Sequence, residues 1–385
     1  MIDTASASDT HCPQPEETYC IFGDLHLIPG KPEDPRLARF FAELELRQRR
    51  NERLHLVFNG DTFDFAMATQ NGFCSNGSHA VAALDQIEAQ FPQFFTALGQ
   101  VLESKGKVVF ISGNHDLELG IPDVQRRIRC LIESQTSRPV ENHQVVFSSW
   151  FYHPDPSLYI EHGHQYDAEN SVRHPLALTA KNGGKQAYPV GTVLTWYFAA
   201  HFQDLELILN TNRHFWSQAK QILIRYKLKA PYAYWLFAKG ALSCLGQMVK
   251  ASIFPLKEMD SLEAAFARWS GVDPNWIGRI RDLMKKPTHL SPANAAKRVY
   301  DLLLTTKDLR GDLLINDLKR AADRVREITG AQLVVFSHLH TTCEGEGYAN
   351  TGSFSYPRAN NQASFLEVVI RENLPYVNRR FISEF

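Results

Sequence analysis

Short apolar runs, each ending abruptly in polar residues, recur along the chain. Their β-branched and aromatic residues predict β-strands, and the polar residues predict strand ends that carry chemistry. Because ligands bind at the carboxyl ends of the strands in open α/β sheets, we expect the polar clusters to converge. The runs occupy residues 19–22, 54–58, 107–111, 158–160 and 333–336, and the clusters that follow them are GDLH, NGD, SGNHD, EHGH and SHLH.

Segments with helical character lie between the early strands, at residues 35–50 and 80–104, and are expected to be the crossovers of α/β units. A long stretch that is mostly helical and rich in aromatic residues then interrupts this alternation. Strands resume after it and close the fold. The sequence therefore predicts an α/β fold with three parts: a flexible N-terminal tail over residues 1–18, a core over residues 19–167 and 331–385, and an inserted helical lid or cap over residues 168–330.

The chain is close to neutral as a whole, with 41 Lys and Arg residues against 42 Asp and Glu residues. This balance argues against a surface that attracts nucleic acid everywhere. Residues 181–257 are an exception, because ten basic residues there stand against only Asp204 and Glu206. The six cysteines are scattered without a C-x-x-C pair, and the first eighteen residues lack the features of a secretory signal. A cytoplasmic protein with reduced thiols is expected.

Two segments of the predicted insertion approach the length of a membrane span. Residues 186–203 contain no Asp, Glu, Lys or Arg, and residues 231–256 are interrupted only by Lys239 and Lys250. Their polar and charged residues favour packed helices over a transmembrane span. An alternative is a lid that lies on the membrane surface, where aromatic residues would meet lipid and nearby lysines would meet anionic headgroups. Those aromatic residues are Trp196, Tyr197, Trp216, Tyr232, Tyr234 and Trp235.

The polar clusters offer carboxylate, amide and imidazole groups and no thiolate. This donor set suits Mn²⁺, Fe²⁺, Zn²⁺, Co²⁺ or Ni²⁺ in a catalytic site, and it differs from the cysteine-rich set of structural zinc. Paired donors one residue apart would project to one side of an extended segment and chelate together. Two ions about 3.5–4 Å apart would clamp a phosphate and activate a bridging water, which indicates hydrolysis of a phosphate ester. The donors are Asp24, His26, Asp61, Asn114, His115, His162, His164, His338 and His340.

Five segments in this chain order resemble the calcineurin-like metallophosphoesterases: GDLH (23–26), GDTFD (60–64), GNHD (113–116), EHGH (161–164) and SHLH (337–340). The resemblance implies a four-layered β-sandwich flanked by helices. It further implies that a bridging hydroxide is the nucleophile and that His115 is the general acid, with Asp64 orienting its imidazole. Ser337 stands where the family commonly has Gly, and its small size should preserve the backbone path. The implied ligands are Asp24, His26 and His340 for one metal, Asn114, His162 and His338 for the other, and Asp61 as the bridge.

Within that superfamily, the segments DLHL (24–27), GDTFD and HGHQYD (162–167) look most like the branch of the UDP-2,3-diacylglucosamine pyrophosphatases of lipid A synthesis. Those enzymes typically carry Arg where this chain has His115, and their insertion is shorter, so their substrate is not transferred. Three further residues are candidates for substrate binding: His164, Asp167 and Asn170. For His164, contact with a phosphate, support of the metals and simple packing all remain open.

These observations predict a hydrolase with two divalent ions, Mn²⁺ first and Fe, Zn, Co or Ni as alternatives. It would cleave a phosphomonoester, phosphodiester or pyrophosphate bond, with a small or lipid-linked substrate favoured. Peripheral membrane contact through the insertion is a further expectation, and no protein partner is implied. One alternative is a nuclease for single-stranded nucleic acid that uses the basic, aromatic insertion. A second is a non-catalytic scaffold at the membrane.

Overall fold

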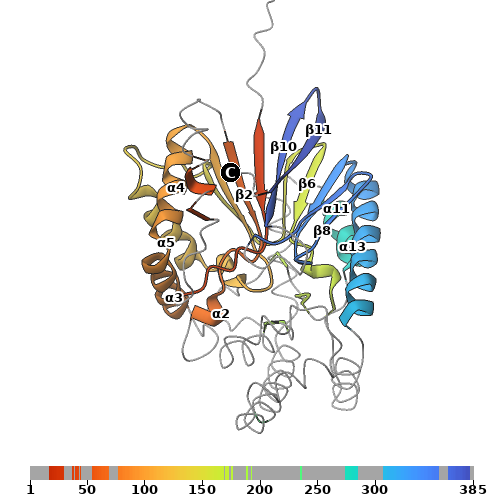
Figure 1. Cartoon of the computed structure of the whole chain (residues 1–385), viewed down its shortest axis with the longest axis horizontal. Coiled ribbons are helices and arrows are strands. Elements are labelled where there is room, and N and C mark those ends of the chain that lie inside the picture. Colours follow the sequence, from red (N-terminus) through yellow and green to blue (C-terminus); the bar gives the residue numbers. More distant parts are fainter. Residues whose placement is uncertain are drawn as a thin grey trace, which may run out of the picture.

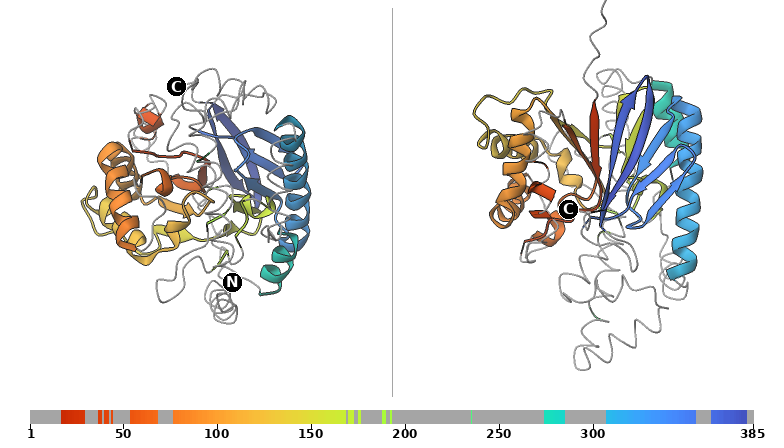
Figure 2. Two further views of the ribbon diagram at one scale, coloured as in Figure 1. Left: turned by 90° about the horizontal axis from the view of Figure 1, so that it is seen from below. Right: turned by 45° about the horizontal axis from the view of Figure 1, so that its top comes forward.

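The structure of the chain is a computed structural model, and it describes a two-sheet core together with isolated parts of the rest. Two sheets stand face to face, with helices on the outer side of each (Figure 1). Figure 2 shows this layering from two further directions. The described residues are 17–29, 37–38, 40–42, 44, 54–68, 77–168, 170–172, 175–176, 188–189, 192, 235, 274–284, 307–354 and 363–381.

The first sheet has the strand order β11-β10-β1-β2-β3-β4. The four strands β1 to β4 are parallel, so the carboxyl ends of β1, β2 and β3 meet at one edge of the sheet. Strands β10 and β11 continue the sheet in antiparallel pairing. The bounds are β1 Thr18–Phe22, β2 Leu54–Asn59, β3 Lys107–Ile111, β4 Val145–Ser148, β10 Ser364–Arg371 and β11 Leu374–Phe381.

The second sheet has the order β5-β6-β7-β9-β8. Strands β6, β7 and β9 are parallel, and β6 and β7 deliver the EHGH and SHLH clusters at their carboxyl ends. Strands β5 and β8 pair antiparallel at the two edges. The bounds are β5 Phe151–Asp155, β6 Leu158–Glu161, β7 Leu333–Phe336, β8 Thr342–Gly345 and β9 Tyr348–Thr351.

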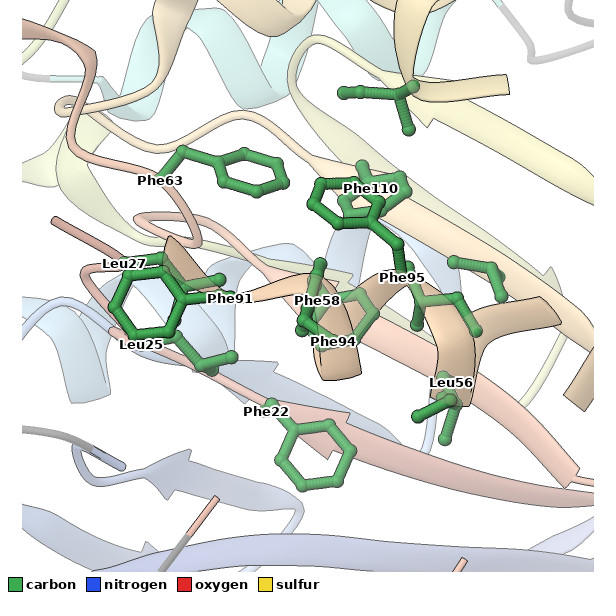
Figure 3. Packing of buried hydrophobic residues seen from close by; sticks show 14 of the residues in the cluster. Phe22, Leu25, Leu27, Leu56, Phe58, Phe63, Phe91, Phe94, Phe95 and Phe110 are labelled. Atoms are coloured by element: carbon green, nitrogen blue, oxygen red, sulfur yellow. The ribbon is translucent and has the colours of Figure 1, made fainter. Parts of the chain in front are cut away.

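Alternating side chains divide each strand between two cores, because successive residues of a strand face opposite sides of the sheet. Tyr19 and Ile21 of β1 lie between the sheets, where they share an apolar cluster with Ile160 of β6. Cys20 and Phe22 of β1 belong instead to the cluster beneath the helices of the first sheet. Figure 3 shows the aromatic rings of that cluster, with Phe22, Phe58 and Phe110 following one another across β1, β2 and β3.

Helices cover the outer face of each sheet and complete four layers. The first sheet is covered by α2 (Phe65–Ala68), α3 (Gly77–Gln90), α4 (Pro92–Glu103) and α5 (Pro122–Glu133), with the short 3-10 helix η1 (Leu117–Gly120) before α5. The second is covered by α11 (Pro274–Leu283) and α13 (Lys307–Thr329). A further 3-10 helix, η2 (His164–Tyr166), follows β6. The predicted α/β fold with two packed sheets is confirmed.

The last part of the predicted insertion is not a lid. Ile277 and Ile280 of α11 and Leu318 of α13 pack with Phe336 of β7 in the outer core of the second sheet. These helices lie in the range 168–330, but their apolar faces cover the sheet, so the core resumes well before residue 331. Most of the range 168–273, including most of the two apolar segments and of the basic segment 181–257, lies outside the described residues.

Two boundaries on the amino-terminal side also differ from prediction. The segment with helical character expected over residues 80–104 begins earlier, at Gly77, and contains two helices, since α3 ends at Gln90 and Pro92 opens α4. The expected tail of residues 1–18 ends earlier, since Thr18 already pairs with Leu54 in the sheet, and residues 1–16 lie outside the described part. In the portion of the chain that the structure describes, no helix has both the length and the apolar character needed to cross a membrane.

Candidate metal centre

The loops after the strands place five of the predicted ligands in left-handed backbone conformation. Positive φ angles occur at Asp24 (55°), His26 (47°), Asp61 (52°), His338 (68°) and His340 (54°). The prediction that the donor pairs one residue apart lie in extended segments is therefore wrong, because both members of each pair have left-handed backbone. Such backbone is uncommon for residues other than Gly and persists where surrounding structure holds it, most often at functional sites.

The first two loops are held together by backbone hydrogen bonds. The amide of Asp24 donates to the carbonyl of Gly60 at 3.2 Å, and that of His26 donates to the carbonyl of Asp61 at 2.9 Å. The amide of His338, in the fifth loop, donates to Asp24 Oδ2 at 3.1 Å. Residues more than 300 positions apart are thereby brought to one place, as the convergence of strand ends predicts.

Asp24, His26 and His340 form one group of ligand atoms. Asp24 Oδ1 lies 3.1 Å from His340 Nε2, and His26 Nε2 lies 3.4 Å from the same nitrogen. All three atoms lie within 4.8 Å of one another, which is compact enough for a single cation. The grouping agrees with one of the two ligand sets implied by the resemblance.

Asp61, His162 and His338 form a second group of that size. Asp61 Oδ2 lies 3.3 Å from His162 Nε2 and 3.9 Å from His26 Nε2, which belongs to the first group. The carboxylate of Asp61 therefore stands between the two groups. The third predicted ligand of this set, Asn114, is joined to Asp61 through its neighbour, since the amide of His115 donates to Asp61 Oδ1 at 2.8 Å.

Several donor atoms of the site have no hydrogen-bond partner among the described residues and so remain available to bind a divalent cation. Three buried atoms, Asp24 Oδ1, Asn114 Oδ1 and His162 Nε2, have no hydrogen-bond partner among the described residues. An amide oxygen, a carboxylate oxygen and an imidazole nitrogen are all ligands of Mn²⁺-like ions. His162 Nδ1 donates to the carbonyl of Asn59 at 2.8 Å, which leaves Nε2 as the nitrogen with a lone pair for a metal.

The buried carboxylates of the site favour a positive charge beside them. Burial raises the pKa of Asp61, but the nearby charges of His162 and His115 outweigh it and hold that pKa well below its ordinary value. Burial lowers the pKa of His162, yet the carboxylate of Asp61 raises it to about 9. The buried carboxylates thus draw a proton onto an imidazole, and a divalent cation would neutralise the same charge while leaving the imidazole neutral for ligation.

Asp64 contacts two imidazoles at once. Its Oδ2 lies 3.1 Å from His115 Nδ1 and 3.7 Å from His26 Nδ1. Burial raises the pKa of Asp64, but the neighbouring His115 and His26 outweigh this effect. The net result is a pKa below the ordinary value, so the carboxyl stays ionised. The contact with His115 agrees with the predicted role of Asp64 in orienting that imidazole. The contact with His26 means that Asp64 can also orient a predicted metal ligand.

The three candidate substrate residues contact predicted ligands. Asp167 Oδ2 lies 3.2 Å from His338 Nε2 and accepts a hydrogen bond from Asn170 at 2.8 Å. Asn170 in turn accepts from Asn114 Nδ2 at 3.3 Å. His164 is buried, its ring lies 5.3 Å from that of His162, and burial and the charge of His162 lower its pKa well below the ordinary value. His164 is therefore a neutral neighbour of the second group.

Sequence reasoning missed two buried residues that hold the loops in register. Asp116 accepts from the amides of Gly113 at 2.6 Å and Thr62 at 2.8 Å, and so ties the GNHD loop to the GDTFD loop. Asn59 donates to the carbonyl of Glu161 and to Ser337 Oγ, both at 2.9 Å, and so links the ends of β2, β6 and β7. Both residues belong to the polar clusters NGD and SGNHD, and this membership was the available signal.

Ser337 occupies its position through side-chain hydrogen bonds. Its Oγ accepts from Thr351 Oγ1 at 2.8 Å as well as from Asn59, and its amide donates to the carbonyl of His162 at 2.9 Å. Gly23 leaves the room that the hydroxyl needs, because a Cβ there would lie 2.2 Å from Ser337 Oγ. The Ser337 hydroxyl is therefore accommodated beside Gly23, in the loop that carries His338.

A comparison with protein families matches residues 18–253 to the calcineurin-like phosphoesterases. The matched range is more than half of the chain and contains the GDLH, GDTFD, GNHD and EHGH segments. No curated protein matches the sequence.

Proposed function

This chain belongs to the calcineurin-like phosphoesterase family and is a metal-dependent phosphoesterase; on that premise we propose that it holds two divalent ions and hydrolyses a small or lipid-linked phosphate ester. The position of Asp61 carries the proposal. Its carboxylate lies between the two ligand groups, 3.9 Å from His26 and 3.3 Å from His162, as a bridging ligand requires.

The ligand assignment follows the two groups. Asp24, His26 and His340 would hold one ion, Asn114, His162 and His338 the other, and Asp61 both. Oxygen and imidazole donors favour Mn²⁺, with Fe, Zn, Co or Ni ions as alternatives. When bound, such ions lower the pKa of a water molecule and neutralise charge that develops on the phosphate.

His115 would act on the leaving group. Its side chain is 12% exposed, more than that of Asp64, which is 4% exposed and lies 3.1 Å from its Nδ1. The negative charge of an ionised Asp64 orients the His115 ring and stabilises its positively charged imidazolium form. In that form Nδ1 donates to Asp64, and Nε2 carries a second proton that it can give to the departing oxygen. Asp64 is then a positioning residue, since it would act through His115.

The proposal leaves open which kind of phosphate ester is the substrate. Monoesters, diesters and pyrophosphates all present the same phosphoryl oxygens to a pair of cations, so the donors alone do not select among them. The nuclease and scaffold alternatives depend on the basic and aromatic insertion, nearly all of which lies outside the described residues. Peripheral membrane contact stays a prediction for the same reason, and cytoplasmic location also stays a prediction.

The test is a metal-supplemented assay on a panel of esters. Turnover of p-nitrophenyl phosphate, bis-p-nitrophenyl phosphate, a sugar nucleotide and single-stranded DNA is measured with Mn²⁺ and after chelation. Asp61→Asn and Asn114→Ala should abolish metal-dependent turnover. Asp85→Asn is the matched control, because Asp85 is a half-exposed carboxylate on α3 that pairs with Arg127. Full turnover by the Asp61 variant would refute the proposal, and preferred cleavage of DNA would move it to the nuclease alternative.

A further inference from the structure

The amide of Asn114 is oriented by two acceptors. Its Nδ2 donates to Asn170 Oδ1 at 3.3 Å and to Thr192 Oγ1 at 3.4 Å. A primary amide has a donor end and an acceptor end, and a cation can be bound only by the oxygen. Because both neighbours accept at the nitrogen, the oxygen is the end left for a ligand, and it is buried without a hydrogen-bond partner among the described residues.

Thr192 is suited to this task by its hydroxyl. Its Oγ1 donates to the backbone carbonyl of Asn114 at 2.8 Å and accepts from Nδ2 of the same residue. With the proton committed to the carbonyl, the hydroxyl oxygen can only accept from the side chain. Thr192 is 1% exposed, so water does not compete for these bonds. An apolar residue of the same shape would supply neither bond.

Other residues of the same region also contact the loop after Asn114. Tyr188 donates a hydrogen bond to the buried carboxylate of Glu118. Val172 and Tyr188 pack against Leu117. Two contacts therefore join the segments: Thr192 with Asn114, and Tyr188 with Glu118. The two residues on each side are four positions apart. The loop with a predicted ligand is therefore braced by residues from beyond the EHGH cluster.

We propose that Thr192 is a positioning residue that holds the Asn114 amide with its oxygen toward one cation, so that the region inserted after β6 sets the metal affinity of that site. The inference rests on the proposed role of Asn114 as a ligand. It assigns to the insertion a part in building the metal centre, besides any part in substrate choice. Substitution of a residue that hydrogen-bonds to a metal ligand typically lowers the affinity for the metal about 10–100-fold.

The experiment is a calorimetric titration of metal-free protein with Mn²⁺. Thr192→Val should weaken one of two binding events at least tenfold and leave the other within about threefold. Thr192→Ser keeps the hydroxyl and should restore wild-type affinity. Thr329→Val is the matched control, because Thr329 is also buried and its Oγ1 donates to a carbonyl, that of Val325, at the same 2.8 Å, far along α13. Its metal titration should be unchanged.

The outcomes separate the inference from the proposed function. Wild-type affinity in Thr192→Val, or an equal loss in Thr192→Ser, would overturn the inference. If the valine variant does not fold when free of metal, Thr192→Ala removes the hydroxyl without a replacing methyl group and is titrated instead. Asn114→Ala serves as the reference. If its titration matches wild type, the proposed function itself fails, whereas a loss there without a loss at Thr192 overturns only the inference.

Discussion

Gly113 of the candidate metal centre should not tolerate a larger residue. A Cβ at this position would lie 2.2 Å from Asp61 Oδ1 and 2.5 Å from the backbone nitrogen of Asp61. Real Cβ contacts are essentially never shorter than 3.0 Å, so in Gly113→Ala the two loops must separate by about 1 Å, and a backbone atom cannot rotate away. A misplacement of about 1 Å can lower turnover about 100-fold.

The same displacement disturbs two hydrogen bonds that hold the loop. The amide of Gly113 donates to Asp116 at 2.6 Å, and that of His115 donates to Asp61 at 2.8 Å. Overpacking of this kind typically costs about 1–3 kcal/mol of stability. We therefore expect Gly113→Ala to fold with a lower melting temperature and to lose at least about 100-fold in kcat/KM for bis-p-nitrophenyl phosphate with Mn²⁺.

Gly278→Ala provides the control within the same chain. Gly278 lies in α11 with nothing within 4 Å of an added Cβ, so Ala should stabilise the helix by about 0.5–1 kcal/mol and leave turnover unchanged. Melting temperature, Mn²⁺ titration and kcat/KM are measured for both variants. If Gly113→Ala keeps wild-type turnover and metal affinity, the close approach of the two loops is not what forms the site.

Three further changes test other parts of the structure. Burial raises the pKa of Glu118 from its ordinary 4.5 to about 7, so the folded state loses stability as the pH rises through that interval. Glu118→Gln should remove this loss, on the order of 3 kcal/mol between pH 4.5 and 7, and an equal pH dependence of unfolding in both proteins would contradict it. His115→Ala should lower turnover of alkyl phosphates about 100-fold while both Mn²⁺ ions still bind, and loss of metal in that variant would place His115 among the ligands. Chelation should abolish turnover and lower the melting temperature, and Mn²⁺ at 100 times its Kd should return about 2.7 kcal/mol of stability; a melting temperature indifferent to Mn²⁺ would rule out a metal bound in the folded state.

Much of the core was predictable because its signals are local. A short apolar run rich in β-branched and aromatic residues favours a strand, which in this fold is buried on both faces, and the polar cluster after Phe22 or Phe58 marks where that strand ends. Pro92 was also a local signal, and it could have divided the helical segment expected over residues 80–104 into two helices. The assignment of 168–330 to one insertion could not be corrected in this way. An amphipathic helix such as α13 shows that it has an apolar face but not which sheet that face covers.

The amino-acid sequence by itself determined the α/β class, the order along the chain of the strands that carry the clusters, and the candidate donors. Only the tertiary structure decided that Asp24 and His26 turn through left-handed backbone, that Asp61 stands between two ligand groups, and that Thr192 reaches Asn114. The reason is the distance along the chain over which each interaction acts. Strand formation and turn chemistry depend on neighbours along the chain, whereas a contact across 78 residues or 314 exists only after the sheets have packed and the loops have been placed in register.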